Sequence, residues 1–136
     1  MTEKELCALA IKAAERSYSP YSACKVGSAL LASSGKVYLG CNIENAAFSP
    51  TVCAERTAFF KAVSEGETEF EMIAVVGKKN GSIIKSFPPC GVCRQVMAEF
   101  CYDEFKVLLV SGENEFKEKR LSELLPCSFD EENVRG

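Results

Sequence analysis

Two cysteine segments constrain the fold of this chain more than any other feature of its sequence. Cys53 is followed two residues later by Glu55, and Cys90 is separated from Cys93 by two residues. The chain holds 8 cysteines and no histidine. A metal site built from these residues therefore has sulfur and carboxylate ligands, and the fold must bring two distant segments together.

Both cysteine segments lie where a predicted helix begins. The apolar spacing predicts helices over residues 53–65 and 91–100, and a helix N-terminus stabilises the thiolate form that binds metal. The spacing puts Cys90 and Cys93 about one helical turn apart, so both sulfurs can reach one ion. We expect Cys53, Cys90 and Cys93 to hold one zinc ion (Zn2+). Three protein ligands leave the fourth tetrahedral position open, as in catalytic sites.

Glu55 is the expected catalytic residue of this site. It lies two residues after Cys53 and can point toward the open position, where zinc lowers the pKa of a water from 15.7 to roughly 7. A C-x-E segment followed by P-C-x-x-C is the three-cysteine form of the zinc deaminase signature. Zinc with three thiolates has a formal charge of about −1, which Arg56 is placed to offset by donating to sulfur.

The pattern of apolar residues predicts the α/β class. Helices and strands alternate after residue 50, which favours a three-layer α-β-α sandwich with a mixed five-stranded sheet. The whole chain, residues 1–136, is expected to form a single catalytic domain. The other predicted elements are a helix over 3–16, strands over 26–32, 36–41, 72–76, 105–110 and 115–117, a loop over 77–89, and a short helix over 122–125.

Composition excludes several classes of function. The net charge is −3 with no basic run, which argues against a nucleic-acid surface. No apolar stretch approaches the roughly 20 residues that span a bilayer, so no membrane association is expected. The polar N-terminus does not look like a signal peptide, so we expect a cytoplasmic protein whose cysteines stay reduced.

Other interpretations of the cysteines remain open at this stage. Cys90 and Cys93 alone are compatible with a redox pair, and Cys41 or Cys101 as a fourth ligand would close the site into a structural one. The cysteines outside the motifs are expected to be small buried apolar side chains: Cys7, Cys24, Cys41, Cys101 and Cys127. Arg94 and Gln95 are candidates for capping or packing the second helix.

From Tyr18 to about Phe129 the chain closely resembles the cytidine deaminase family, which comprises small homotetrameric zinc enzymes of pyrimidine salvage. The matching stretches are Pro20-Tyr21-Ser22, Val26-Gly27-Ser28-Ala29-Leu30-Leu31, Gly40-Cys41-Asn42-Ile43-Glu44-Asn45-Ala46, Cys53-Ala54-Glu55-Arg56-Thr57-Ala58, Pro89-Cys90-Gly91-Val92-Cys93-Arg94-Gln95 and Leu124-Leu125-Pro126-Cys127-Ser128-Phe129.

The resemblance implies roles that the residues alone do not give. Asn42 and Glu44, otherwise ordinary turn residues, are similar to the family's ribose-binding pair. The Ala54 backbone and Glu55 would contact the pyrimidine edge, and Phe129 of a neighbouring subunit would cover the base. The implied reaction is hydrolytic deamination of cytidine or 2′-deoxycytidine at C4, with blasticidin S as the rival substrate.

The chain departs from the family pattern at two positions. Cys24 stands where the family usually has an aromatic residue that packs against the nucleoside, so we expect a looser pocket or a changed substrate preference. Phe48 stands where many members have tyrosine at a subunit interface.

Overall fold

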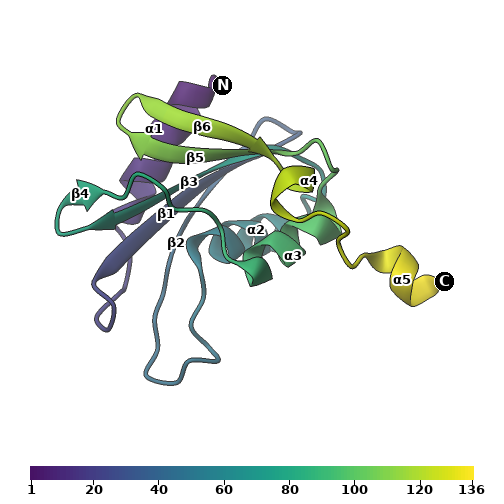
Figure 1. Ribbon diagram of the computed structural model, residues 1–136, viewed down its shortest axis with the longest axis horizontal. Helices are drawn as coiled ribbons and strands as arrows, with labels where there is room; N and C mark the ends of the chain where they lie inside the picture. The colour runs from purple at the N-terminus through teal and green to yellow at the C-terminus, as the bar shows by residue number, and fades with distance from the viewer.

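A twisted mixed sheet forms the centre of the molecule, with helices on both faces (Figure 1). The computed structural model describes residues 1–136. The strands are β1 (Cys24–Ala32), β2 (Val37–Cys41), β3 (Phe70–Lys79), β4 (Ser82–Ile83), β5 (Lys106–Gly112) and β6 (Glu115–Arg120). The helices are α1 (Glu3–Ala14), α2 (Ala54–Ser64), α3 (Gly91–Phe100), α4 (Leu121–Leu124) and α5 (Glu131–Arg135).

The strands follow the order β2-β1-β3-β5-β6, and the two-residue β4 pairs with β3 beside this path. β3 and β5 are parallel, whereas the other pairs are antiparallel. A parallel pair needs a crossover connection, and the segment that carries α3 supplies it. The sheet is thus mixed, as predicted.

The two faces of the sheet carry separate apolar clusters because side chains alternate along each strand. On one face, Leu6 and Ala10 of α1 pack with Leu108 of β5. On the other face, Phe59 of α2 and Met97 of α3 pack in a second cluster with strand residues. The predicted three-layer α-β-α sandwich is confirmed.

Two glycines let the helices approach the sheet closely. A Cβ atom at Gly27 would lie 2.2 Å from the Ala10 carbonyl oxygen of α1. A Cβ atom at Gly40 would lie 2.2 Å from the Ala54 carbonyl oxygen, at the first residue of α2. Only glycine allows such contacts, so the backbone of β2 fixes the height at which α2 begins above the sheet.

The structure differs from the prediction mainly at element ends. The loop predicted over 77–89 is wrong at its start, because β3 continues to Lys79 and turns into β4. Asn80 and Gly81 have positive φ angles of 54° and 77°, as a tight hairpin turn requires. The first helix ends at Ala14 instead of residue 16, and α5 was not predicted. None of the helices has the length and apolar character needed to cross a membrane.

Candidate metal centre and its cavity

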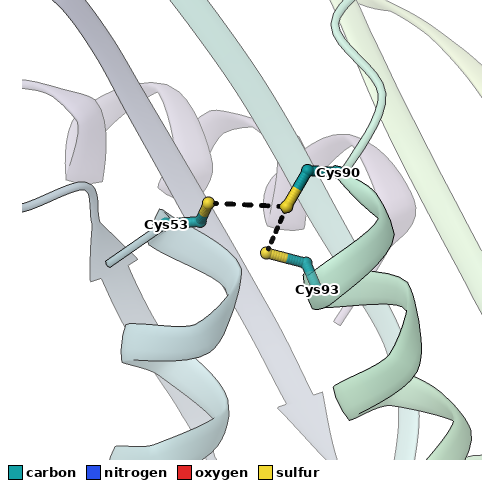
Figure 2. Close-up of side chains that lie close together, drawn as sticks. All are labelled: Cys53, Cys90 and Cys93. Carbon is teal, nitrogen blue, oxygen red and sulfur yellow. Dashed lines mark hydrogen bonds between the residues drawn. The ribbon is translucent and has the colours of Figure 1, made fainter. Parts of the chain in front are cut away.

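The three predicted zinc ligands converge where α2 and α3 begin (Figure 2). Cys53 and Cys90 are the N-terminal caps of these helices, and Cys93 lies in the first turn of α3. The Sγ atoms of Cys53 and Cys90 are 3.7 Å apart, and those of Cys90 and Cys93 are 3.5 Å apart. The sequence prediction that these segments meet is therefore confirmed, although the role of the cysteines stays a prediction.

The sulfur positions fit one tetrahedral zinc ion. Zn–S bonds of about 2.3 Å at tetrahedral angles place two sulfurs about 3.8 Å apart, and the three Sγ atoms lie within 4.8 Å of one another. The group consists of these three cysteines alone, and no further cysteine or acidic residue belongs to it. Cys41 instead contacts the Arg16 carbonyl oxygen, and Cys101 caps the far end of α3. The group is thus open on one side, and the closed four-cysteine alternative finds no support.

Nearby hydrogen-bond donors favour the thiolate form of Cys53. Arg56 donates a hydrogen bond from Nη2 to Cys53 Sγ at 3.3 Å. The pKa of Cys53 is lowered to about 5, chiefly because Cys93 and then Arg56 donate hydrogen bonds to its sulfur. The pKa of Cys93 is raised, because this thiol donates to Cys53 and is buried. A dication placed among the sulfurs would replace the shared proton.

Glu55 is a buried carboxylic acid with an unused oxygen. Its side chain is 2% exposed, and Oε1 has no hydrogen-bond partner in the protein. Burial raises the pKa of Glu55 to about 7. A buried polar atom without a partner is rare in native proteins and indicates a group or ligand that the protein chain does not provide. The sequence placed Glu55 beside the cysteines, and the structure adds its burial.

A cavity of about 260 Å³ adjoins the cysteines and Glu55. Its walls come from the β1 entry, the β2–α2 connection and the segment before α3. The lining residues are Ser22, Cys24, Val26, Asn42, Glu44, Thr51, Val52, Cys53, Glu55, Phe87, Pro88 and Cys90. The predicted pair Asn42 and Glu44 thus lies in the same cavity as Cys53 and Cys90, two of the three predicted metal ligands.

The Asn42 side chain is buried, and its amide group already makes three hydrogen bonds within the protein. Its Oδ1 accepts a hydrogen bond from the Val26 N–H at 2.9 Å and one from the Ser17 hydroxyl. Its Nδ2 donates to the Cys24 carbonyl oxygen at 2.8 Å. One amide N–H therefore remains for a ligand in the cavity.

The Glu44 carboxylate is held by the loop before β1. Its Oε1 accepts from the Tyr21 and Ser22 N–H groups at 2.9 and 3.1 Å, and its Oε2 accepts from the Ser22 hydroxyl. These bonds, above all the one from the Ser22 hydroxyl, lower the pKa of Glu44. Ala23, next in the chain, has a positive φ of 59°, so the turn that delivers Ser22 is strained.

Ala54 and Phe129 do not line the cavity of their own chain. The Ala54 carbonyl oxygen accepts from the buried Ser28 hydroxyl at 2.9 Å, which leaves its N–H, at the helix start, as the group available to a ligand. Phe129 is 60% exposed in the tail that runs away from the sheet in Figure 1. Gln95 fixes that tail by donating to the Phe129 carbonyl oxygen at 2.7 Å. The predicted roles of both residues stay predictions.

Several cavity residues were not singled out from the sequence. Phe87 and Thr51 had no local signal, because loops bring them to the cavity. Ser22 lies in the quoted Pro20-Tyr21-Ser22 stretch, so its signal was present but had no assigned role. Arg94, expected to cap or pack, donates to the Pro89 and Leu124 carbonyl oxygens at 2.8 and 2.6 Å and so fixes the residue before Cys90.

Comparison with known proteins gives the family. Residues 1–109 match the family model of the cytidine and deoxycytidylate deaminase zinc-binding region. The chain belongs to this deaminase family. This confirms the predicted resemblance and the prediction of an enzyme, and it agrees with a three-cysteine group compatible with one zinc ion.

Relatives match this deaminase over nearly its whole length. It is 48% identical over 134 residues to a cytidine deaminase of Sporosarcina psychrophila, covering 98% of this chain and 96% of that one. It is 47% identical over 134 residues to a cytidine deaminase of Halalkalibacterium halodurans, covering 98% of both chains. The crystal structure of a cytidine deaminase from Burkholderia pseudomallei superposes with a TM-score of 0.86 at 42% identity, covering 95% of this chain and 100% of that one. A blasticidin-S deaminase of Bacillus cereus is less similar, at 29% identity over 108 residues, covering 76% of each chain.

Proposed function

We propose that this chain, as one catalytic domain over residues 1–136, deaminates cytidine and 2′-deoxycytidine hydrolytically to uridine and 2′-deoxyuridine with release of ammonia. The observation that carries the proposal is the unpartnered, buried Oε1 of Glu55 in the same cavity as Cys53 and Cys90. Relatives that are named cytidine deaminases and match almost the whole chain support this choice of reaction.

The reaction needs one acidified water and one proton carrier. Cys53, Cys90 and Cys93 would hold the zinc ion, which would supply the acidity by lowering the pKa of a water from 15.7 to about 7. Glu55 takes one proton from the water as the water oxygen bonds to C4, and it gives that proton to N3 of the pyrimidine. It then moves the second proton from the oxygen on C4 to the amino group, and the C4–N bond breaks to release ammonia. A pKa raised by burial keeps Glu55 able to both accept and donate near neutral pH. Arg56, through its bond to Cys53, offsets thiolate charge, and the Ala54 N–H is available to the base.

The cavity offers the sugar one donor and one acceptor. Asn42 has one free N–H, and Glu44 already accepts three hydrogen bonds at its two oxygens. A carboxylate has about four acceptor positions, so Glu44 can accept one more bond. This pair matches a single hydroxyl group, which donates to Glu44 and accepts from Asn42. The 3′-hydroxyl is common to ribose and deoxyribose, so both nucleosides satisfy the pair, and a nucleic-acid chain esterified at O3′ does not.

A homotetramer with shared active sites accounts for the exposed aromatic side chains and the small cavity of the single chain. Phe48 is 89% exposed, and Phe60 of α2 and Phe129 of the tail are 50% and 60% exposed. Burial of these aromatic side chains between subunits would remove apolar surface from water. The cavity of about 260 Å³ is also smaller than the roughly 300–1,000 Å³ typical of ligand pockets. In the tetramer, Phe129 of a neighbouring subunit covers the base.

The proposed cellular role is pyrimidine salvage in the cytoplasm. All 8 cysteines are free thiols, which suits a reducing compartment. Free nucleosides are the expected substrates, because the net charge of −3 offers no basic surface for a polynucleotide.

Steady-state rates on cytidine, 2′-deoxycytidine and blasticidin S test the proposal. We expect comparable kcat/KM for the two nucleosides and at least about tenfold less for blasticidin S, because that compound lacks the pentose hydroxyl that the Asn42–Glu44 pair matches. A preference for blasticidin S would overturn the substrate assignment. An intact Cys90–Cys93 disulfide without metal in the active protein would instead favour a redox pair. Glu55→Gln in the same assay serves as the inactive control.

A further inference from the structure

Asn42 is oriented by two backbone groups of β1 and by one hydroxyl, that of Ser17, which does not line the cavity. The backbone fixes which way its amide points, because the Val26 N–H can only donate to Oδ1 and the Cys24 carbonyl can only accept from Nδ2. The Ser17 hydroxyl adds a second hydrogen bond to Oδ1. Ser17 follows α1 and does not line the cavity, so it has no direct access to a ligand there.

The direction of the Ser17 hydrogen bond follows from proton counting. The Ser17 oxygen lies within hydrogen-bond distance of both Asn42 Oδ1 and the Ser19 hydroxyl, which is 3.1 Å away. A hydroxyl has a single hydrogen, and an amide oxygen cannot donate. Ser17 therefore donates to Asn42, and Ser19 donates to Ser17. The result is a chain of hydrogen bonds that ends on the buried Asn42 oxygen.

We infer that Ser17 is a positioning residue for nucleoside binding, which acts by holding Asn42 with its free N–H directed at the sugar hydroxyl. The inference rests on the proposed function, since the ligand is the sugar of a nucleoside. With both acceptor positions of Oδ1 occupied, Asn42 meets the ligand only as a donor, and Glu44 only as an acceptor. Ser17 thereby contributes to the selection of an unmodified hydroxyl.

The kinetic test compares Ser17→Ala with Ser19→Ala, a matched change in the same loop that leaves the bond from Ser17 to Asn42 in place. One neutral hydrogen bond is worth roughly 0.5–1.5 kcal/mol, so Ser17→Ala should raise KM for cytidine by about 2- to 10-fold. The kcat should stay within about twofold, because the sugar contact is the same in ground and transition states. Ser19→Ala should leave both constants unchanged.

The substrate 3′-deoxycytidine separates positioning from general loosening. It lacks the hydroxyl that Asn42 contacts, so its KM should be the same for the original chain and for Ser17→Ala. An unchanged KM for cytidine in Ser17→Ala, or an equal rise for both substrates, would overturn the inference.

A readout without turnover keeps the inference distinct from the proposed function. In zinc-loaded protein labelled with 15N, the Asn42 side-chain amide resonances should shift in Ser17→Ala and stay in place in Ser19→Ala. If the original chain deaminates cytidine but these resonances and KM do not respond to Ser17→Ala, the inference alone fails. If the resonances respond but no cytosine nucleoside is turned over, the proposed function fails.

Discussion

Exchange of Glu55 for glutamine should remove turnover and at the same time make the folded chain more stable. Glutamine has nearly the same shape, so the packing of α2 persists, but it cannot carry the proton. Loss of a general acid–base group costs about 10²- to 10⁴-fold in rate, and we expect kcat to fall by at least that factor. Zinc content should remain about one ion per chain, because Glu55 lies outside the three-cysteine group.

The stability gain follows from the raised pKa of Glu55. In the unfolded chain the carboxyl ionises near its ordinary pKa of 4.5, whereas burial in the folded chain raises the pKa to about 7. Between these pH values the folded state binds a proton that the unfolded state has lost, so the free energy of unfolding falls as pH rises. The difference between these two pKa values lowers the free energy of unfolding by about 3 kcal/mol, an effect that is fully present above pH 7. Glutamine does not titrate, so the advantage of Glu55→Gln grows from near zero at about pH 4.5 to about 3 kcal/mol above pH 7.

Urea unfolding of zinc-free protein at pH 5 and pH 8 measures this difference. With a slope of about 1–3 kcal/mol per M, the midpoint of Glu55→Gln should exceed that of the original chain by roughly 1–3 M at pH 8 and by much less at pH 5. Glu44→Gln is the matched control with the opposite sign, because hydrogen bonds lower the pKa of Glu44 and glutamine loses part of them. A lower midpoint for Glu55→Gln at pH 8 would refute the account of an unsatisfied buried carboxyl, and a tenth of the original kcat would refute its role as proton carrier.

Three further changes test other parts of the site. Gly40→Ala should lose zinc, as measured by elemental analysis, because its Cβ would lie 2.2 Å from the Ala54 carbonyl oxygen and displace the start of α2; retention of a full zinc ion would contradict this. Ala23→Gly should raise the free energy of unfolding by up to about 1 kcal/mol, since it relieves a positive φ of 59°, and a lower urea midpoint would show that the turn is not strained. Arg56→Gln should release zinc to a chelating dye faster than the original chain does, because the pKa of Cys53 then rises; an equal rate would remove Arg56 from the account.

The metal centre was the part of the site most open to prediction from sequence. Its residues lie at helix starts, so local sequence spacing determines where each side chain lies on its helix. The start of α2 alone positions Cys53, and the start and first turn of α3 alone position Cys90 and Cys93. That the two starts meet depends on the sheet, and the absence of histidine restricted the alternatives enough to predict it.

The proposed sugar-binding pair was not predictable from local sequence pattern. Asn42 and Glu44 appear as turn residues until the loop over residues 17–22 is placed beside them, and long-range pairing of Tyr18 with Ile43 does this. The resemblance to a family identified the pair, but not the serines that orient it. Ser17 in particular has no sequence signal, since its partner lies 25 positions away.

The predicted strand boundaries were wrong where pairing with a neighbouring strand determines the length of the strand. β6 extends from Glu115 to Arg120, beyond the predicted 115–117, because β5 offers backbone partners that its charged sequence does not suggest. The Asn80-Gly81 pair, in contrast, is a sequence typical of a hairpin turn, although a loop was predicted there.

An all-sulfur ligand set of Cys53, Cys90 and Cys93 would make the proposed activity sensitive to oxidants and to the supply of zinc. Thiolates are oxidised to sulfenic acid or disulfide, which reductants reverse, whereas further oxidation is permanent. The two apolar clusters that hold the helices to the sheet do not include Cys53, Cys90 or Cys93. We therefore expect oxidation of these thiols or withdrawal of zinc to stop turnover before it unfolds the chain, so that reductant and metal would restore activity without new synthesis of the chain.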